Sequence, residues 1–190
     1  ILQDIWKNID EFTNEIISNY NNILFICGDF PGYGGAATNC SHIANFIKAR
    51  QSKKSEKSEQ LQKRVFSIYF NYSDETTKRY EKTDNYIVVD QNDLVNQLYK
   101  IKKDKFIPDV VILKTAVNLN FQQIFNKNVE VTYLVSGIYL NTLNKPYTEL
   151  KTKSEQEKYI NPSVIRQIQA STNSFCNSVI HKKFLKNIIT

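Results

Sequence analysis

Hydrophobic residues along this chain gather in short continuous runs, and these runs alternate with stretches that have a helical period. The runs predict strands over residues 22–27, 64–70, 86–90, 108–114, 129–138 and 171–176. Unbroken apolar runs of this length, bounded by turn residues, are typical of strands buried on both faces of a parallel sheet. Apolar residues three or four positions apart predict helices over residues 38–50, 91–103, 118–126, 162–169 and 177–189.

Residues 1–20 show the clearest helical period, with Ile5, Ile9, Phe12 and Ile16 on one face. We therefore expect an N-terminal amphipathic helix there. Its polar face is mostly acidic, so an anionic membrane surface is a poor partner. Packing against its own domain is the favoured role, and a connector from an upstream domain is the alternative.

Strands that alternate with helices predict an α/β fold. We expect a Rossmann-like doubly wound parallel sheet of about six strands with helices on both faces, formed by residues 21–190 and preceded by the helix of residues 1–20. Ligands of such folds bind beyond the carboxyl ends of the strands. The loops after residues 27, 113 and 135 are therefore expected around one crevice. The polar stretch 51–63 is expected to be a solvated loop.

Composition narrows the functional classes only slightly. The formal net charge of +6 is spread along the chain and suits anionic ligands in general. The three cysteines lack metal-ligand spacing, so we expect reduced thiols, no bound metal and a cytoplasmic location. No apolar run approaches the roughly 18 residues that a membrane span requires. The chain begins at Ile1 and contains no Met, so we expect it to be a piece of a longer protein.

The strongest local signal is "GDFPGYGGAATN", residues 28–39, which holds four of the chain's 5 glycines. It lies between a predicted strand and a predicted helix, where free backbone N–H groups and the helix dipole favour a phosphate. Gly34 and Gly35 lack a Cβ, so a diphosphate or a sugar can approach the main chain there. With Ala36 they form the candidate phosphate loop. A simple tight turn would need only one or two glycines.

A dinucleotide site is a weaker interpretation of the same stretch. "GYGGAA", residues 32–37, fits the pattern G-x-G-x-x-A. However, residues 28–31 separate it from the strand, and residues 69–71 lack the acid that would hold a ribose. Tight binding of NADH would revive a nicotinamide-dependent oxidoreductase.

Four segments in order resemble the N-terminal domain of retaining glycosyltransferases of the GT-B fold, family 4 type. They are "ILFICGDFPGYGGAATNCSHIANFIKA", "PDVVILK", "VEVTYLVSGI" and "SFCNSVIHKKFLK", over about residues 22–188. The resemblance implies transfer of a sugar from a nucleoside diphosphate donor to a carbohydrate or lipid-linked acceptor. It implies no metal or other cofactor, and the donor would be held mostly by a C-terminal domain of the same parent chain. Alone, this piece is expected to be inactive or nearly so.

The chain departs from the family at two positions. Lys114 and Ser136 stand where the family often has His, which leaves the catalytic residues unknown and keeps a non-catalytic binding module as the alternative function. The candidate acceptor or crevice residues are Asp29, Tyr33, Asn39, Lys114, Ser136 and Gly137. Four of them have an ordinary structural role as well: Asp29 as a turn-former, Tyr33 as an exposed aromatic residue, Asn39 as a helix cap, and Lys114 as a surface lysine.

The predicted C-terminal helix adds one further open choice. Lys182, Lys183 and Lys186 suit the negative end of its dipole. They also suit a peripheral contact with a membrane that carries a lipid-linked acceptor. Nucleic acid is not expected as a partner.

Overall fold

The computed structural model describes most of the chain. The described residues are 2–4, 11–12, 14–16, 18–28, 41–49, 64–71, 81–135, 137–140, 143–146, 149–176, 182–183 and 185–186.

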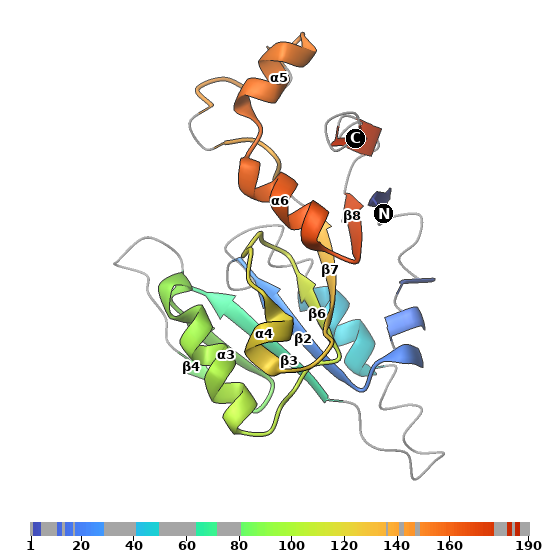
Figure 1. Ribbon diagram of the computed structural model, residues 1–190, viewed down its shortest axis with the longest axis vertical. Helices are drawn as coiled ribbons and strands as arrows, with labels where there is room; N and C mark the ends of the chain where they lie inside the picture. The colour runs from blue at the N-terminus through green and yellow to red at the C-terminus, as the bar shows by residue number, and fades with distance from the viewer. Residues whose placement is uncertain are drawn as a thin grey trace.

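A single open sheet forms the centre of the molecule (Figure 1). Its spatial order is β1-β8-β7-β6-β2-β3-β5-β4. Of the strands that the structure describes, seven run parallel, and the short β4 runs antiparallel beside β5. The strands are β1 (Leu2–Asp4), β2 (Asn22–Cys27), β3 (Arg64–Phe70), β4 (Glu81–Lys82), β5 (Tyr86–Val89), β6 (Val110–Leu113), β7 (Glu130–Val135) and β8 (Asn173–Cys176).

The six strands predicted from apolar runs are all present. In chain order they occupy the positions 3-2-1-4-5-6 across the sheet, which is the order of a Rossmann-like doubly wound fold. The α/β class and the parallel sheet are thus confirmed. β2 lies at the centre, and its residues from Ile23 to Cys27 are fully buried. A strand covered on both faces explains the unbroken apolar run "ILFIC".

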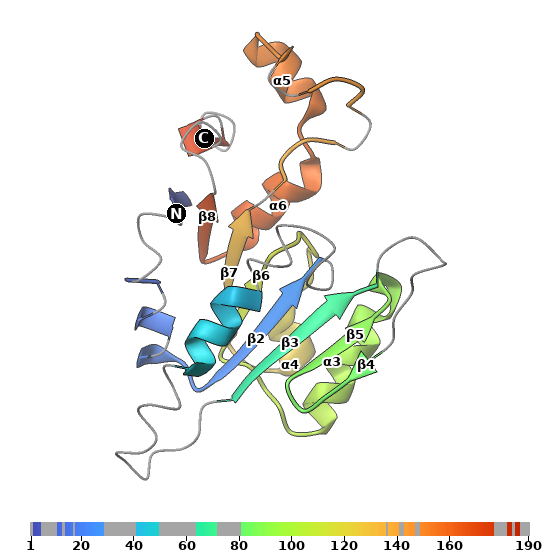
Figure 2. The ribbon, with the colours of Figure 1, turned by 180° about the vertical axis from the view of Figure 1, so that it is seen from behind.

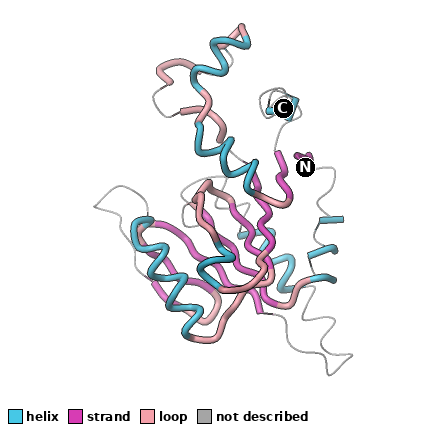
Figure 3. The backbone as a smooth tube through the Cα atoms, in the orientation of Figure 1, coloured by secondary structure: helices cyan, strands magenta, loops and turns pink. Residues whose placement is uncertain are grey.

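Helices cover both faces of the sheet. One face carries α3 (Leu94–Lys103), preceded by the 3-10 turn η2 (Gln91–Asp93), together with α4 (Phe121–Phe125) and α6 (Pro162–Ala170) (Figures 1 and 3). The other face carries the helical residues 41–49 and the segment around Phe12 and Ile16 (Figure 2). Two separate apolar cores result, one on each side of the sheet.

The N-terminal helix predicted over residues 1–20 is wrong in its first part. Residues 2–4 form β1, which pairs in parallel with β8 and so belongs to the same sheet. Helix is present only in the described residues 11–12, 14–16 and 18–19. Pairing with a strand from the far end of the chain overrides the local period, because the exposed edge of β8 offers backbone hydrogen bonds to residues 2–4.

A second difference lies between β7 and α6, where the hydrophobic pattern predicts no helix. The charged stretch there forms α5 (Lys153–Tyr159), which stands away from the sheet (Figure 1). The side chain of Thr152 accepts a hydrogen bond from the Glu155 N–H at 3.1 Å, and a Glu155 carboxylate oxygen accepts one from the Lys151 N–H at 3.2 Å. This arrangement is close to a capping box, and it starts the helix without an apolar face.

Candidate functional site at the carboxyl edge of the sheet

The strand order changes direction between β2 and β6. The chain leaves β2 through the helix of residues 41–49 on one face and reaches β3 on one side. It leaves β6 through α4 on the opposite face and reaches β7 on the other side. The two outgoing connections therefore diverge, and such a switch point is where open α/β sheets bind ligands. β2, β6 and β7 are neighbours, so the loops after residues 27, 113 and 135 begin side by side at one edge of the sheet. The crevice expected between these loops stays a prediction.

Lys114 directly follows β6 at this switch point. Its backbone N–H donates to the Ile26 carbonyl at 2.9 Å, so it stays in register with β2. The residue is only 3% exposed, which rules out the surface lysine considered from the sequence. Burial lowers its pKa from 10.5 to about 8, because the charged ammonium has lost most of its water. A desolvated cation at the end of a central strand is suited to an anionic ligand.

The two described glycines at this edge, Gly28 and Gly137, both have room for a side chain. A Cβ added to Gly28 would lie 3.7 Å from the Thr115 Cβ, an ordinary van der Waals distance. A Cβ added to Gly137, after β7, would meet nothing within 4 Å. Gly28 and Thr115 therefore lie close together just after β2 and β6, while Gly137 borders open space.

The loop after β6 is fixed by a buried side chain of α6. Gln167, which is 2% exposed, accepts hydrogen bonds from the N–H groups of Val117 at 3.2 Å and Asn118 at 2.8 Å. Asn118 has a left-handed backbone with φ of 51°, and its side chain donates to the Ser163 carbonyl at 3.3 Å. These contacts hold the segment that follows Lys114 against a helix, so that segment is preorganised.

A polar pair that the sequence reasoning missed lies at the ends of the neighbouring strands. The Asn71 side chain, after β3, donates to the Asp90 carboxylate, after β5, at 3.4 Å. The Asn71 N–H also donates to the Val89 carbonyl at 2.9 Å. The sequence signal was an acid directly after the run "YIVV", but only the strand order brings it beside Asn71. The two side chains can together bond a ligand hydroxyl.

Cysteine chemistry differs from the expectation of three reduced thiols. Cys27, the last residue of β2, is disulfide-bonded, and its partner lies outside the described residues. Cys176, the last residue of β8, is a buried free thiol. A disulfide is typical of oxidising compartments, so it does not favour the cytoplasmic location expected from the sequence, which stays a prediction.

Several candidate residues lie outside the described part of the chain. They are Asp29, Tyr33, Gly34, Gly35, Ala36, Asn39 and Ser136. The phosphate-loop interpretation of residues 28–39 therefore stays a prediction. Within the described ranges, no group of three or more His, Cys, Asp or Glu side chains is arranged to hold a metal ion. Among the helices that the structure describes, none has the length and apolarity to cross a membrane.

Comparisons with protein-family models, with curated proteins and with solved structures give no match for this chain. The glycosyltransferase resemblance consequently rests on the quoted sequence motifs alone. The Rossmann-like assignment rests on the strand order and the crossovers.

Proposed function

We propose that the chain is the Rossmann-like, acceptor-side domain of a glycosyltransferase. In this proposal the parent enzyme moves a sugar from a nucleoside diphosphate donor to a carbohydrate or lipid-linked acceptor. The observation that carries the proposal is the buried Lys114 at the switch point of the sheet. Its position is where a parallel α/β sheet binds a ligand, and its charge matches a diphosphate.

The energetics of Lys114 support a binding role. Keeping an ammonium desolvated in the folded protein opposes stability, because water would solvate it better. Groups whose pKa is shifted by burial are common at functional sites. An anion at the carboxyl edge would favour the charged form of Lys114 and raise its pKa toward the ordinary value.

The remaining parts of the proposed site would act on the donor and the acceptor. The backbone N–H groups of residues 34–36 would face the diphosphate, and they would stabilise the negative charge that develops as it leaves. Asp29, Tyr33 and Asn39 would bond or stack on the acceptor. The Asn71–Asp90 pair adds hydroxyl-bonding capacity at the same edge of the sheet. Most donor contacts would come from a second domain of the parent chain.

Isothermal titration of this chain with UDP and with GDP tests the binding step. We expect weak binding that Lys114→Met reduces by about tenfold or more, because a charge-assisted hydrogen bond contributes about 1.5–3 kcal/mol. Lys100→Met on the exposed side of α3 is the matched control, and it should bind like the unaltered chain. Equal affinity in the two variants would contradict the assignment of Lys114.

Sugar transfer by the full-length parent enzyme tests the chemical step. Gly35→Val should abolish transfer, because a branched side chain would block the approach of the diphosphate. Lys100→Met, on the exposed side of α3 and outside the proposed site, is the control, and its turnover should be normal. Normal turnover of Gly35→Val would refute the phosphate-loop assignment. Nucleotide binding without any sugar transfer would favour the alternative, a non-catalytic binding module. The absence of His at positions 114 and 136 also favours that alternative.

A further inference from the structure

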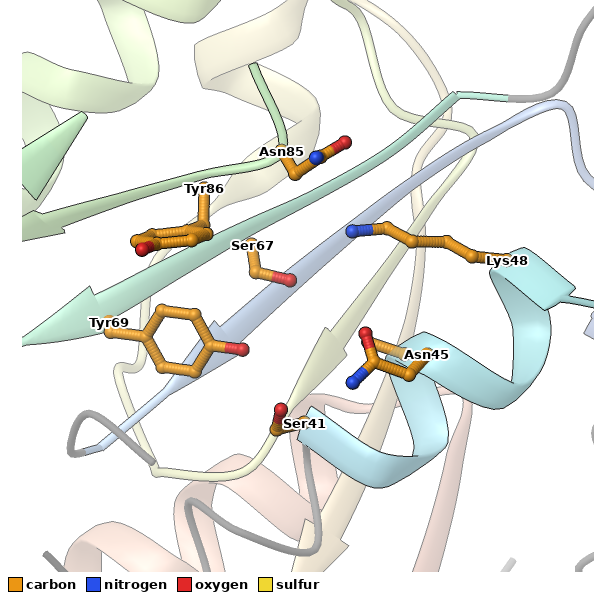
Figure 4. A pocket seen from close by; sticks show the side chains of 8 residues that line it. Ser41, Asn45, Lys48, Ser67, Tyr69, Asn85 and Tyr86 are labelled. Atoms are coloured by element: carbon orange, nitrogen blue, oxygen red, sulfur yellow. The ribbon is translucent and has the colours of Figure 1, made fainter. Parts of the chain in front are cut away.

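A second candidate site lies on one face of the sheet, between the helix of residues 41–49 and the strands β3 and β5. It is a cavity of about 210 Å³. Its lining residues are Ser41, Ala44, Asn45, Lys48, Ser67, Tyr69, Asn85 and Tyr86. Figure 4 shows the side chains of Lys48, Asn45 and Ser41 reaching from the helix toward Ser67 and Tyr69 on β3.

The polar lining is unusual for its place in the fold. Strands inside a parallel sheet normally present apolar side chains to both faces. β3 instead presents Ser67, which is 2% exposed, and Tyr69, which is 5% exposed, to the face under the helix. The Tyr69 ring meets the Tyr86 ring edge-on, with centroids 5.8 Å apart, and together they form an aromatic wall.

The lining groups favour negative charge. Lys48 is the one charged residue among these eight, and no carboxylate is found among the described residues that line the cavity. The ammonium of Lys48, the hydroxyls of Ser41 and Ser67 and the amide of Asn45 are all hydrogen-bond donors. The hydroxyl of Tyr86 donates to Glu81 at 2.5 Å, so this tyrosine contributes its ring to the wall. Burial also lowers the pKa of Lys48, which an anion would reverse.

We propose that this cavity binds a compact oxyanion, a phosphate or a carboxylate group of a small molecule, between Lys48 and Ser67. The volume limits the size of the ligand, because sites for drug-sized molecules span about 300–1,000 Å³. A bound oxyanion would join the helix of residues 41–49 to β3 and thereby stabilise the domain. This site is separate from the proposed donor site, because Lys114 does not line it.

Thermal unfolding and NMR titration with inorganic phosphate test the proposal. We expect a saturable rise in Tm, together with shifts of the Ser67 and Asn85 amide signals. Lys48→Met should weaken binding by about tenfold or more, as expected for the loss of a charge-assisted hydrogen bond. Ser67→Ala, which removes a single hydroxyl, should weaken phosphate binding less than Lys48→Met does. It provides the test if Lys48→Met fails to fold. Lys103→Met, on the opposite side of the sheet, is the control and should bind normally.

Parallel titrations with glycerol phosphate and with lactate distinguish a phosphate group from a carboxylate group. Sodium chloride at equal ionic strength controls for general screening. A Tm response equal to that of chloride, or one that Lys48→Met and Ser67→Ala both retain, would overturn the proposal. A phosphate response lost in Lys114→Met but kept in Lys48→Met would place the anion at the carboxyl edge instead. If the unaltered chain shows the phosphate response but does not bind UDP, the proposed function is refuted and this inference still holds.

Discussion

Replacing Lys114 with methionine should stabilise the folded chain at neutral pH. The two side chains are similar in length, but methionine carries no charge that must be desolvated. A pKa lowered from 10.5 to about 8 means that folding disfavours the charged form. At about 1.4 kcal/mol for each pH unit, the cost is about 3 kcal/mol. We therefore expect Lys114→Met to raise the free energy of unfolding at pH 7 by as much as about 3 kcal/mol.

The pH dependence of this difference has a definite sign. Below pH 8 Lys114 is charged in both the folded and the unfolded chain, so the full cost is present. Between pH 8 and 10.5 the unfolded chain holds the proton more tightly than the folded one, and the stability of the unaltered chain rises with pH. Above pH 10.5 the cost is gone. The advantage of Lys114→Met should consequently shrink as the pH rises from 8 to 10.5.

Urea denaturation of both proteins at several pH values measures this difference. Subtracting the two curves cancels the titration of the other lysines and of the tyrosines. Lys100→Met, on an exposed face of α3, controls for the loss of one positive charge and should change stability by less than about 0.5 kcal/mol. If Lys114→Met is not more stable than the unaltered chain at pH 7, or if its gain in unfolding free energy does not depend on pH, the reasoning is refuted. Other interactions in the folded protein would then offset the desolvation cost of the Lys114 ammonium.

Three further predictions concern stability and redox state. Gln167→Leu should destabilise the chain by about 1–3 kcal/mol for each backbone donor left without its acceptor, with faster hydrogen exchange at the Asn118 amide, and an unchanged exchange rate would contradict this. Asp109→Asn should cost about 1 kcal/mol of unfolding free energy at pH 7 and nothing well below pH 3.8. Burial raises the pKa of Asp109, but hydrogen bonds from Lys127 and two backbone N–H groups lower it by more, so the folded chain favours the carboxylate. If urea denaturation showed that the variant and the unaltered chain lose the same stability on acidification, this prediction would be wrong. Peptide mapping without reductant should find Cys27 in a disulfide, and free thiols at all three cysteines would contradict the structure.

The sequence reveals the strands well because each central strand is buried on both faces. The run "NILFIC" needs no partner to be recognised, and the structure places it as β2 in the middle of the sheet. The start of α6 can also be predicted from the sequence, because Asn161 and Pro162 are typical of a helix N-terminus. In the structure the Asn161 side chain accepts a hydrogen bond from the Ser163 N–H at 3.0 Å. In both elements the signal is local, and the tertiary structure agrees with it.

Features that depend on distant pairing could not be predicted in this way. β1 exists because residues 2–4 find β8, and their helical period gives no hint of it. Asp90 becomes a partner of Asn71 only because β3 and β5 are neighbours. The burial of Lys114 likewise follows from its place beside β2. For α5, by contrast, the signal was in the sequence: Thr152 and Glu155 have capping-box spacing, but a charged stretch without an apolar face favours a loop by hydrophobic pattern alone.

The pairing of β1 with β8 also constrains when the domain can complete its folding. β8 follows β1 by about 170 residues, and contacts across such a separation form slowly because a long loop must close first. During synthesis, residues 2–4 therefore have no strand to join until residues 174–176 have left the ribosome. We therefore expect this border of the sheet to form after the central strands have paired with their neighbours.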